Sequence, residues 1–227
     1  MTYGMDLLSN INKYIDHSVL KPFVTYKEIE KHCLFALEYK FASVCVNPFH
    51  TKQCYEILKN SEVKVCTVVG FPLGLTTKNI KIKEAVESVE NGATELDIVW
   101  NISAFKSKDY TYVENELKEI IKHTPNVVHK IIVETAYLTQ EEKIDALDIV
   151  IQSGAHYIKT STGFAEKGAD IEDVKLWKSL SKDRIKIKAS GGIKAINTVL
   201  AFINAGADRI GTSSTEKIMK EVDGNVL

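Results

Sequence analysis

The feature of the sequence that most limits the fold is a regular alternation of short, β-branched apolar segments with longer segments of helical periodicity. The predicted strands cover residues 14–16, 41–46, 63–69, 94–99, 127–134, 156–160, 185–188 and 209–211. The predicted helices cover 26–39, the stretch after Pro48 to Lys59, Thr76 or Thr77 to Glu90, 110–123, 140–153, 171–180, 195–204 and a last one from Ser214. This alternation is typical of a parallel sheet whose strands are linked by helices.

A weak internal repeat supports this organisation. Its copies are 92–97, 154–159 and 206–211, each a glycine and an alanine that lead from a helix into a strand. Their sixth residues are Asp97, Lys159 and Gly211. If the copies are equivalent, these three residues lie at similar heights near the carboxyl ends of the strands, where barrel enzymes keep their sites.

The 227 residues suit one α/β barrel at the short end of its size range. No shift in composition and no Pro/Gly-rich linker divides the chain, and its eight units match a closed (β/α)8 barrel, the TIM barrel. The competing architecture is an open doubly wound sheet, but the glycine fingerprint of that fold is missing near Asp16. We therefore predict a single domain over residues 1–227 with a short N-terminal helix within 5–14.

Composition excludes several partners. The net charge is -1 and lysines alternate with glutamates, so no nucleic-acid partner is expected. Residues 1–10 lack the features of a signal peptide, and no long apolar run occurs. We therefore expect a cytoplasmic location and no association with a membrane. Neither the six histidines nor the acidic residues show ligand spacing, and we predict no metal. The isolated cysteines, at 33, 45, 54 and 66, are predicted to be reduced.

Two lysines at strand ends suggest carbonyl chemistry. Lys159 lies at the end of an apolar strand. Its ammonium group either reaches solvent or sits in a pocket that lowers its pKa, and a lowered pKa makes a lysine nucleophilic. Lys186 and Lys188 share one face of their strand, and an ammonium at Lys188 beside Lys159 would disfavour protonation of Lys159. The alternative is that Lys186 and Lys188 are surface charges.

Asp97 is the candidate proton relay. It shares a strand face with Glu95, opposite Leu96 and Ile98, and an interior carboxylate there could pair with the lysines and move protons. The alternative is an ion-pair partner that only offsets the burial of the lysines.

Three hydroxyl- and glycine-rich loops follow neighbouring strands and favour a phosphate site. Their candidate residues are Thr162, Gly163, Gly191, Gly192, Gly211, Ser213 and Ser214, with added charge from Lys194. Each loop alone is more typical of a turn.

Three further residues are lesser candidates. Asp16 either binds a substrate hydroxyl or caps a helix. Cys45 is either a buried small side chain or part of the pocket wall. Glu134 is predicted to balance Lys130, which lies on the same strand face.

Taken together, these motifs resemble the deoxyribose-phosphate aldolase family. They lie at Asp16–Pro22, Ser43–Pro48, Val65–Gly74, Glu95–Asp97, Lys159–Phe164, Lys188–Gly192 and Gly211–Ser214. The resemblance implies a class I aldolase that uses a phosphosugar substrate and no cofactor, and reversibly cleaves 2-deoxy-D-ribose 5-phosphate to acetaldehyde and D-glyceraldehyde 3-phosphate. It also implies a homodimer and a role in deoxyribose catabolism.

By the same resemblance, Lys159 matches the Schiff-base lysine, Lys188 the lysine that perturbs it and Asp97 the proton relay. Departures occur at Ser18–Val19, Trp100 and Lys194, which bear on substrate tolerance and phosphate affinity. Two alternatives stay open: another Schiff-base phosphosugar enzyme such as a transaldolase, and a non-catalytic phosphosugar-binding barrel.

Overall fold

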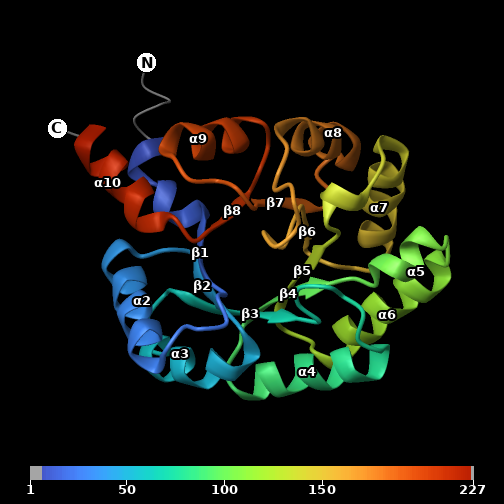
Figure 1. Ribbon diagram of the computed structural model, residues 1–227, viewed down its shortest axis with the longest axis horizontal. Helices are drawn as coiled ribbons and strands as arrows, with labels where there is room; N and C mark the ends of the chain where they lie inside the picture. Colours follow the sequence, from blue (N-terminus) through green and yellow to red (C-terminus); the bar gives the residue numbers. More distant parts are fainter. Residues whose placement is uncertain (1–6, 226–227) are drawn as a thin grey trace.

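The computed structural model describes residues 7–225, which form a closed barrel of parallel strands in the order β1 to β8 (Figure 1). The strands are β1 Ile15–Val19, β2 Ser43–Val46, β3 Lys64–Val69, β4 Glu95–Val99, β5 Val128–Ile132, β6 Tyr157–Lys159, β7 Lys186–Ser190 and β8 Arg209–Thr212. The ring closes where β1 pairs with β8, with Asp16 opposite Gly211. The predicted barrel is confirmed.

Helices surround the strands (Figure 1). They are α2 Tyr26–Tyr39, α3 Thr51–Leu58, α4 Lys78–Glu90, α5 Ile102–Lys106, α6 Tyr110–His123, α7 Gln140–Gln152, α8 Ile171–Ser181, α9 Ile196–Asn204 and α10 Thr215–Asn225. Short 3-10 helices occupy Ile11–Tyr14, Pro48–His50 and Thr135–Tyr137. Thr25 and Glu28 form a capping box at the start of α2, where each residue's side chain binds the other's backbone N–H.

Several boundaries differ from the prediction. Strand β1 continues to Val19, so Asp16 lies near its beginning and not at its end. Strand β5 stops at Ile132, because Glu134 adopts a left-handed conformation with φ 53° that no strand continues. Helix α5 was not predicted. Of the predicted N-terminal helix, residues 5 and 6 lie outside the described residues, 7–9 are helical and Ile11–Tyr14 form a 3-10 turn.

Strand register arranges the inward-facing side chains in layers of four. Within one layer, the contributing residue shifts by two positions, relative to the strand pairing, from each odd-numbered strand to the next. The layer formed by the odd-numbered strands consists of Asp16, Cys66, Lys130 and Lys188. With the same stagger the even strands contribute an upper layer, Cys45, Asp97, Lys159 and Gly211, and a lower layer, Ser43, Glu95, Tyr157 and Arg209. This stagger follows from the tilt of barrel strands and places the sixth residues of the three repeat copies in one layer, as predicted.

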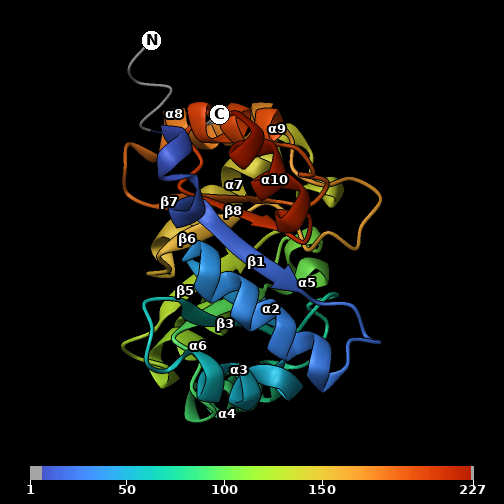
Figure 2. The ribbon, with the colours of Figure 1, turned by 90° about the vertical axis from the view of Figure 1, so that its left-hand side faces the viewer.

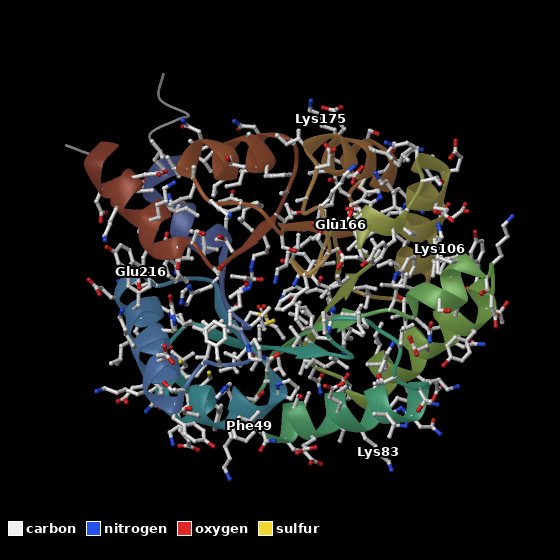
Figure 3. The ribbon with its side chains drawn as sticks, in the orientation of Figure 1. Phe49, Lys83, Lys106, Glu166, Lys175 and Glu216 are labelled. Carbon is white, nitrogen blue, oxygen red and sulfur yellow. The ribbon has the colours of Figure 1, made fainter. Side chains whose placement is uncertain are left out.

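Alternation also separates two kinds of core. The outward-facing residues Leu96, Ile131, Ile158, Ile187 and Ile210 are fully buried in the apolar shell between strands and helices. Apolar side chains fill the interior of most barrels of this kind, but here its layers are rich in charge. Figure 3 shows the side chains around this ring, with Lys83 and Lys175 pointing outward and Glu166, in the loop after β6, nearer its centre.

Candidate active site

Asp97, on β4, lies at the centre of the charged interior. Its Oδ2 accepts hydrogen bonds from Lys159 Nζ at 2.7 Å and from Lys188 Nζ at 2.6 Å. Its Oδ1 accepts from Lys130 Nζ at 2.9 Å and from the Cys66 thiol at 3.1 Å. One carboxylate therefore joins β4 to ammonium groups of β5, β6 and β7.

Two more carboxylates contact two of the same cations. Lys188 Nζ lies 2.5 Å from Asp16 Oδ2, and Lys130 Nζ lies 2.5 Å from Glu95 Oε2. Arg209 links these carboxylates, since its Nε donates to Asp16 Oδ1 at 2.7 Å and its Nη2 to Glu95 Oε2 at 2.9 Å. We call Asp16, Glu95, Asp97, Lys130, Lys159, Lys188 and Arg209 the buried ion cluster.

The pKa shifts in this cluster favour charged groups. Burial alone would raise the pKa of Asp97, but the ammonium groups of Lys130, Lys159 and Lys188 hold it well below its usual value. Burial would lower the pKa of Lys188, but Asp16 and Asp97 raise it. The pKa of Lys130 is likewise raised by its carboxylates and the Cys66 sulfur against the effect of burial. Asp97 is therefore an anion and Lys130 and Lys188 are cations.

Lys159 differs from the other cations of the cluster in its partners. It contacts only one of the cluster's carboxylates, Asp97, and it shares the accepting oxygen with Lys188. Lys188 contacts two carboxylates and Lys130 three. With Arg209, the fully ionised cluster would hold four cations and three carboxylates. Among the lysines of the cluster, Lys159 has the fewest carboxylate contacts.

Such a cluster is not an efficient way to stabilise a fold. Removing each charge from water costs several kcal/mol, which the mutual attraction of the ions only offsets, so a well-packed apolar interior would serve at least as well. A group of ionised side chains inside the barrel therefore points to chemistry.

A cavity of about 460 Å³ lies at the carboxyl ends of the strands. Its wall is mostly apolar and comes from the loops after β3, β4, β5 and β6: Pro72, Leu73, Leu75, Ile102, Ser103, Glu134, Tyr137, Thr162, Phe164 and Ala165. Lys159 is the last residue of β6, and the loop that follows it contributes to this wall. Lys159 is 2% exposed. The cavity is of the size that small organic ligands occupy.

The loops after β6, β7 and β8 pack against one another. Ala169 N donates to the carbonyl oxygens of Ser190 and Gly191 at 3.0 and 3.1 Å, and Thr212 Oγ1 donates to Ile193 O at 2.6 Å. A Cβ on Gly168 would lie 2.2 Å from Gly191 O, so this contact between loops requires glycine. The predicted phosphate loops thus form one continuous surface.

Comparison with known proteins identifies the family of the chain. A family model described as DeoC/LacD family aldolase matches residues 10–221. The chain belongs to the DeoC/LacD aldolase family. The deoxyribose-phosphate aldolase of Aquifex aeolicus is 55% identical over 93% of this chain and 96% of that protein. The deoxyribose-phosphate aldolase of Caldanaerobacter subterraneus is 51% identical over 94% of each.

Solved structures agree. QR15, an aldolase, is 53% identical and superposes with a TM-score of 0.93 over 96% of this chain and 97% of its own. The deoxyribose phosphate aldolase from Aeropyrum pernix, whose structure is described as tetrameric, is 31% identical with a TM-score of 0.89 over 99% of this chain and 97% of its own.

In this DeoC/LacD aldolase, the predicted residues Asp97, Lys159 and Lys188 meet in one contact network. Cys45, also predicted, touches it: its Sγ lies 3.9 Å from Asp97 Oδ2 and is fully buried. Gly211 faces the interior, and a Cβ there would lie 3.1 Å from Lys188 Cε, so this glycine makes room for the lysine.

The other predicted loop residues lie at the surface of the joined loops. Gly163, Gly191 and Gly192 all have positive φ, and Ser213 and Ser214 line a second cavity of about 480 Å³ next to α10. Lys194 is exposed.

Predictions about two residues need correction. Asp16 does not end its strand, and its carboxylate contacts Arg209, Lys188 and the Ser43 hydroxyl. Glu134 does not balance Lys130. It instead accepts hydrogen bonds from the Thr162 backbone N–H and hydroxyl, because the backbone turns away from the strand at that point.

The sequence interpretation missed the cluster roles of Glu95, Lys130 and Arg209. The signal for Lys130 was its alternation with Ile131 in β5, which assigns it to the interior as clearly as Lys188. The signal for Arg209 was weaker, because its strand is short and its partners lie far away in the sequence.

Cys45, Cys66 and Asp97 offer three possible metal-ligating atoms within 4.8 Å of one another. Both oxygens of Asp97 are already bound by ammonium groups, which disfavour a second cation at the same place. Within residues 7–225, no helix combines the length and the apolar character needed to cross a membrane.

Proposed function

We propose that this chain is a class I aldolase that reversibly cleaves 2-deoxy-D-ribose 5-phosphate to D-glyceraldehyde 3-phosphate and acetaldehyde. The observation that carries the proposal is the contact of Lys159 and Lys188 with the same oxygen of Asp97. The segments that follow β4 and β6, the strands of Asp97 and Lys159, contribute to the wall of the cavity. The names and high identity of the relatives support the substrate.

Lys159 is the proposed nucleophile. As a neutral amine it attacks the carbonyl carbon of the open-chain sugar, and loss of water gives a protonated imine. Lys188 remains a cation held by Asp16 and Asp97, so Asp97 does not depend on the proton of Lys159 for its charge balance.

The protonated imine then acts as an electron sink. When the bond between C2 and C3 breaks, its electron pair forms the enamine and the proton of the C3 hydroxyl leaves, so that C3 becomes the aldehyde carbon of D-glyceraldehyde 3-phosphate. A relay through water and Asp97 returns a proton to the enamine carbon, and hydrolysis releases acetaldehyde and the amine of Lys159. The same relay through water and Asp97 accepts the proton of the C3 hydroxyl when the C2–C3 bond breaks.

We assign the substrate's phosphate to the joined loops after β6, β7 and β8. Backbone N–H groups at Gly163, Gly191 and Gly192 and the hydroxyls of Ser213 and Ser214 are available to an anion there. Thr162 lines the cavity next to these loops. Cys45 is assigned to the packing around Asp97.

We further propose that residues 1–227 act as one domain and that the chain forms a homodimer in the cytoplasm. The four buried, unpaired cysteines are compatible with a reducing compartment. Light scattering coupled to size-exclusion chromatography measures the oligomeric state directly; a monomer or a tetramer would contradict the homodimer.

Borohydride trapping tests the proposed chemistry. Reduction in the presence of 2-deoxyribose 5-phosphate should leave a stable adduct, and peptide mapping should locate it on Lys159. Lys159→Ala should lose the adduct and turnover while keeping its circular dichroism spectrum. Lys186→Ala is a matched control, because Lys186 is exposed and lies outside the cluster. Undiminished activity of Lys159→Ala would remove this residue from the nucleophile role.

A further inference from the structure

Glu134 sits in an unusual backbone conformation beside the proposed nucleophile. Its φ is 53°, a left-handed value that costs free energy in residues other than glycine. Both neighbours are fixed: Val133 N donates to Lys159 O at 3.1 Å and Thr135 N donates to Thr160 O at 2.9 Å. The backbone therefore holds Glu134 in a set position relative to the end of β6.

The carboxylate of Glu134 is only half satisfied. The side chain is buried, and its Oε2 accepts from the Thr162 hydroxyl and from Thr162 N at 3.2 Å. Its Oε1 is buried and finds no hydrogen-bond donor among the described residues. A buried polar atom without a hydrogen-bond partner is destabilising, so such atoms in native proteins call for an explanation.

The cavity supplies that explanation. Glu134 and Thr162 line it together, while Leu73, Leu75, Ile102 and Phe164 form apolar parts of its wall. In a mostly apolar cavity, the few polar groups fix the orientation of the ligand and select its functional groups. Because Thr162 occupies Oε2, Oε1 is the atom left to receive a donor from a ligand. Burial raises the pKa of Glu134 against the opposing effect of its Thr162 hydrogen bonds, which is consistent with an incompletely solvated carboxyl group.

We propose that Glu134 contacts the substrate and that its Oε1 accepts a hydrogen bond from the hydroxyl next to the aldehyde carbon of the acceptor. In the cleavage direction this hydroxyl is on C4 of the sugar. Glu134 is thereby a residue that selects 2-hydroxyaldehydes over plain aldehydes. The proposal rests on the aldolase function proposed above and assigns a specificity determinant within the same site.

The test compares two acceptors that differ by one hydroxyl, 2-hydroxypropanal and propanal, each with acetaldehyde as donor. The wild-type enzyme should prefer 2-hydroxypropanal in kcat/KM by about tenfold or more, the range expected for a hydrogen bond to a charged group. Glu134→Gln should reduce this preference to about two- to threefold or less. Glu134→Asp, which keeps the charge but withdraws the carboxylate from the cavity, should also reduce it and serves if Glu134→Gln does not fold.

A purely structural role predicts a different result. If Glu134 only anchors the Thr162 loop, both acceptors should lose kcat/KM by the same factor and their ratio should stay at the wild-type value, which would overturn the proposal. Glu166→Gln is the matched control, since Glu166 is an exposed carboxylate in the same loop (Figure 3) and should leave the ratio unchanged.

Trapping with acetaldehyde separates this proposal from the proposed function. Glu134→Gln should still form the borohydride-stable adduct on Lys159, because acetaldehyde has no hydroxyl for Glu134 to bind. Absence of the adduct from the wild-type enzyme would reject the aldolase function itself. An adduct in both proteins with an unchanged acceptor ratio would reject only the role of Glu134.

Discussion

At the scale of single residues, Asp97 determines the charge balance of the site. Its two oxygens accept from Lys130, Lys159 and Lys188, so no other single carboxylate holds as many ammonium groups by hydrogen bonds within the cluster. Neutralising it leaves those ammonium groups with too little negative charge. The same change removes the proposed proton relay, so stability and turnover should fall together.

We predict that Asp97→Asn lowers the free energy of unfolding by about 3 to 5 kcal/mol. We also predict a loss of turnover of about 10²- to 10⁴-fold. Urea unfolding and the cleavage of 2-deoxyribose 5-phosphate measure the two effects. Cys45→Ala is the matched control, since it removes a neighbour of Asp97 Oδ2 without removing a charge, and should cost about 1 kcal/mol. A stability of Asp97→Asn within about 1 kcal/mol of wild type would contradict this description of the cluster.

At the scale of elements, His17 joins β1 to two helices. Its Nε2 lies 2.8 Å from His32 Nδ1 on α2, and its Nδ1 lies 2.6 Å from Thr215 Oγ1 on α10. Figure 2 shows β1 together with α2 and α10 on this side of the barrel. Burial and the nearby His32 lower the pKa of His17 to about 3.

This shift predicts acid sensitivity. The unfolded chain protonates His17 below about pH 6.5, whereas the folded protein does so only near pH 3, so the stabilising effect of neutral His17 is lost as the pH falls between these values. When the pH is lowered from 7 to 5, His17 alone should reduce the free energy of unfolding by about 2 kcal/mol. Urea unfolding at both pH values measures the loss.

The pH dependence should shrink in His17→Gln. His129, whose pKa burial also lowers to about 4, remains in the variant and keeps part of the slope. An identical difference between pH 7 and pH 5 in both proteins would show that His17 does not carry the effect.

A second element-scale contact joins α4 to α6 outside the barrel. Lys81 Nζ lies 2.8 Å from Glu116 Oε2, and both side chains are fully buried. Lys81 also packs against the loop after β3, since a Cβ on Gly70 would lie 2.9 Å from Lys81 Cε. This pair therefore supports the loop that carries Leu73 and Leu75 to the cavity.

We predict that Lys81→Met lowers the free energy of unfolding by about 3 to 5 kcal/mol, because it leaves Glu116 as an uncompensated buried charge. The double variant Lys81→Met/Glu116→Leu should recover most of this loss, since an apolar pair of similar volume needs no counter-ion. Denaturant unfolding of the four proteins of this cycle gives the coupling. Additive losses would mean that the ion pair is not the source of the effect.

At the scale of the whole molecule, the ion cluster connects both halves of the barrel. Asp16 and Arg209 are 193 residues apart in sequence, and Asp97 and Lys188 are 91 apart, yet each pair is in direct contact. The carboxylates of the cluster, Asp16, Glu95 and Asp97, come from the first half of the chain, and its cations come from the second half. Each half therefore needs the other to balance its buried charges. The barrel should therefore unfold as one cooperative unit.

The two tryptophans test this cooperativity. Trp100 follows β4 and Trp177 lies on α8, so they report on different halves, and both are fully buried. In Trp100→Phe and in Trp177→Phe, the urea transition seen by the remaining tryptophan should coincide with the transition seen by circular dichroism. Separate midpoints within one variant would indicate halves that unfold independently.

Much of the molecule could be predicted from sequence because the relevant signals are local. The two-residue period of strands assigned Asp97 and Lys188 to the faces opposite the neighbouring apolar residues, and the repeat copies assigned Asp97, Lys159 and Gly211 to one level. Glycines and hydroxyls after the last strands marked the anion loops. Errors arose where a strand ended earlier than predicted, as before Glu134. No local sequence pattern indicates the left-handed conformation of this residue.

The sequence by itself determined the order of strands and helices, the alternation that turns charged residues inward and the loops that follow each strand, because these depend on neighbours within a few residues. Only the tertiary structure decided which charges meet. Closure of the barrel between β1 and β8, with a stagger of two residues for every second strand, brings Arg209 to Asp16 and Lys188 to Asp97. That stagger is a property of the closed sheet, since it requires all eight tilted strands to pair around the ring.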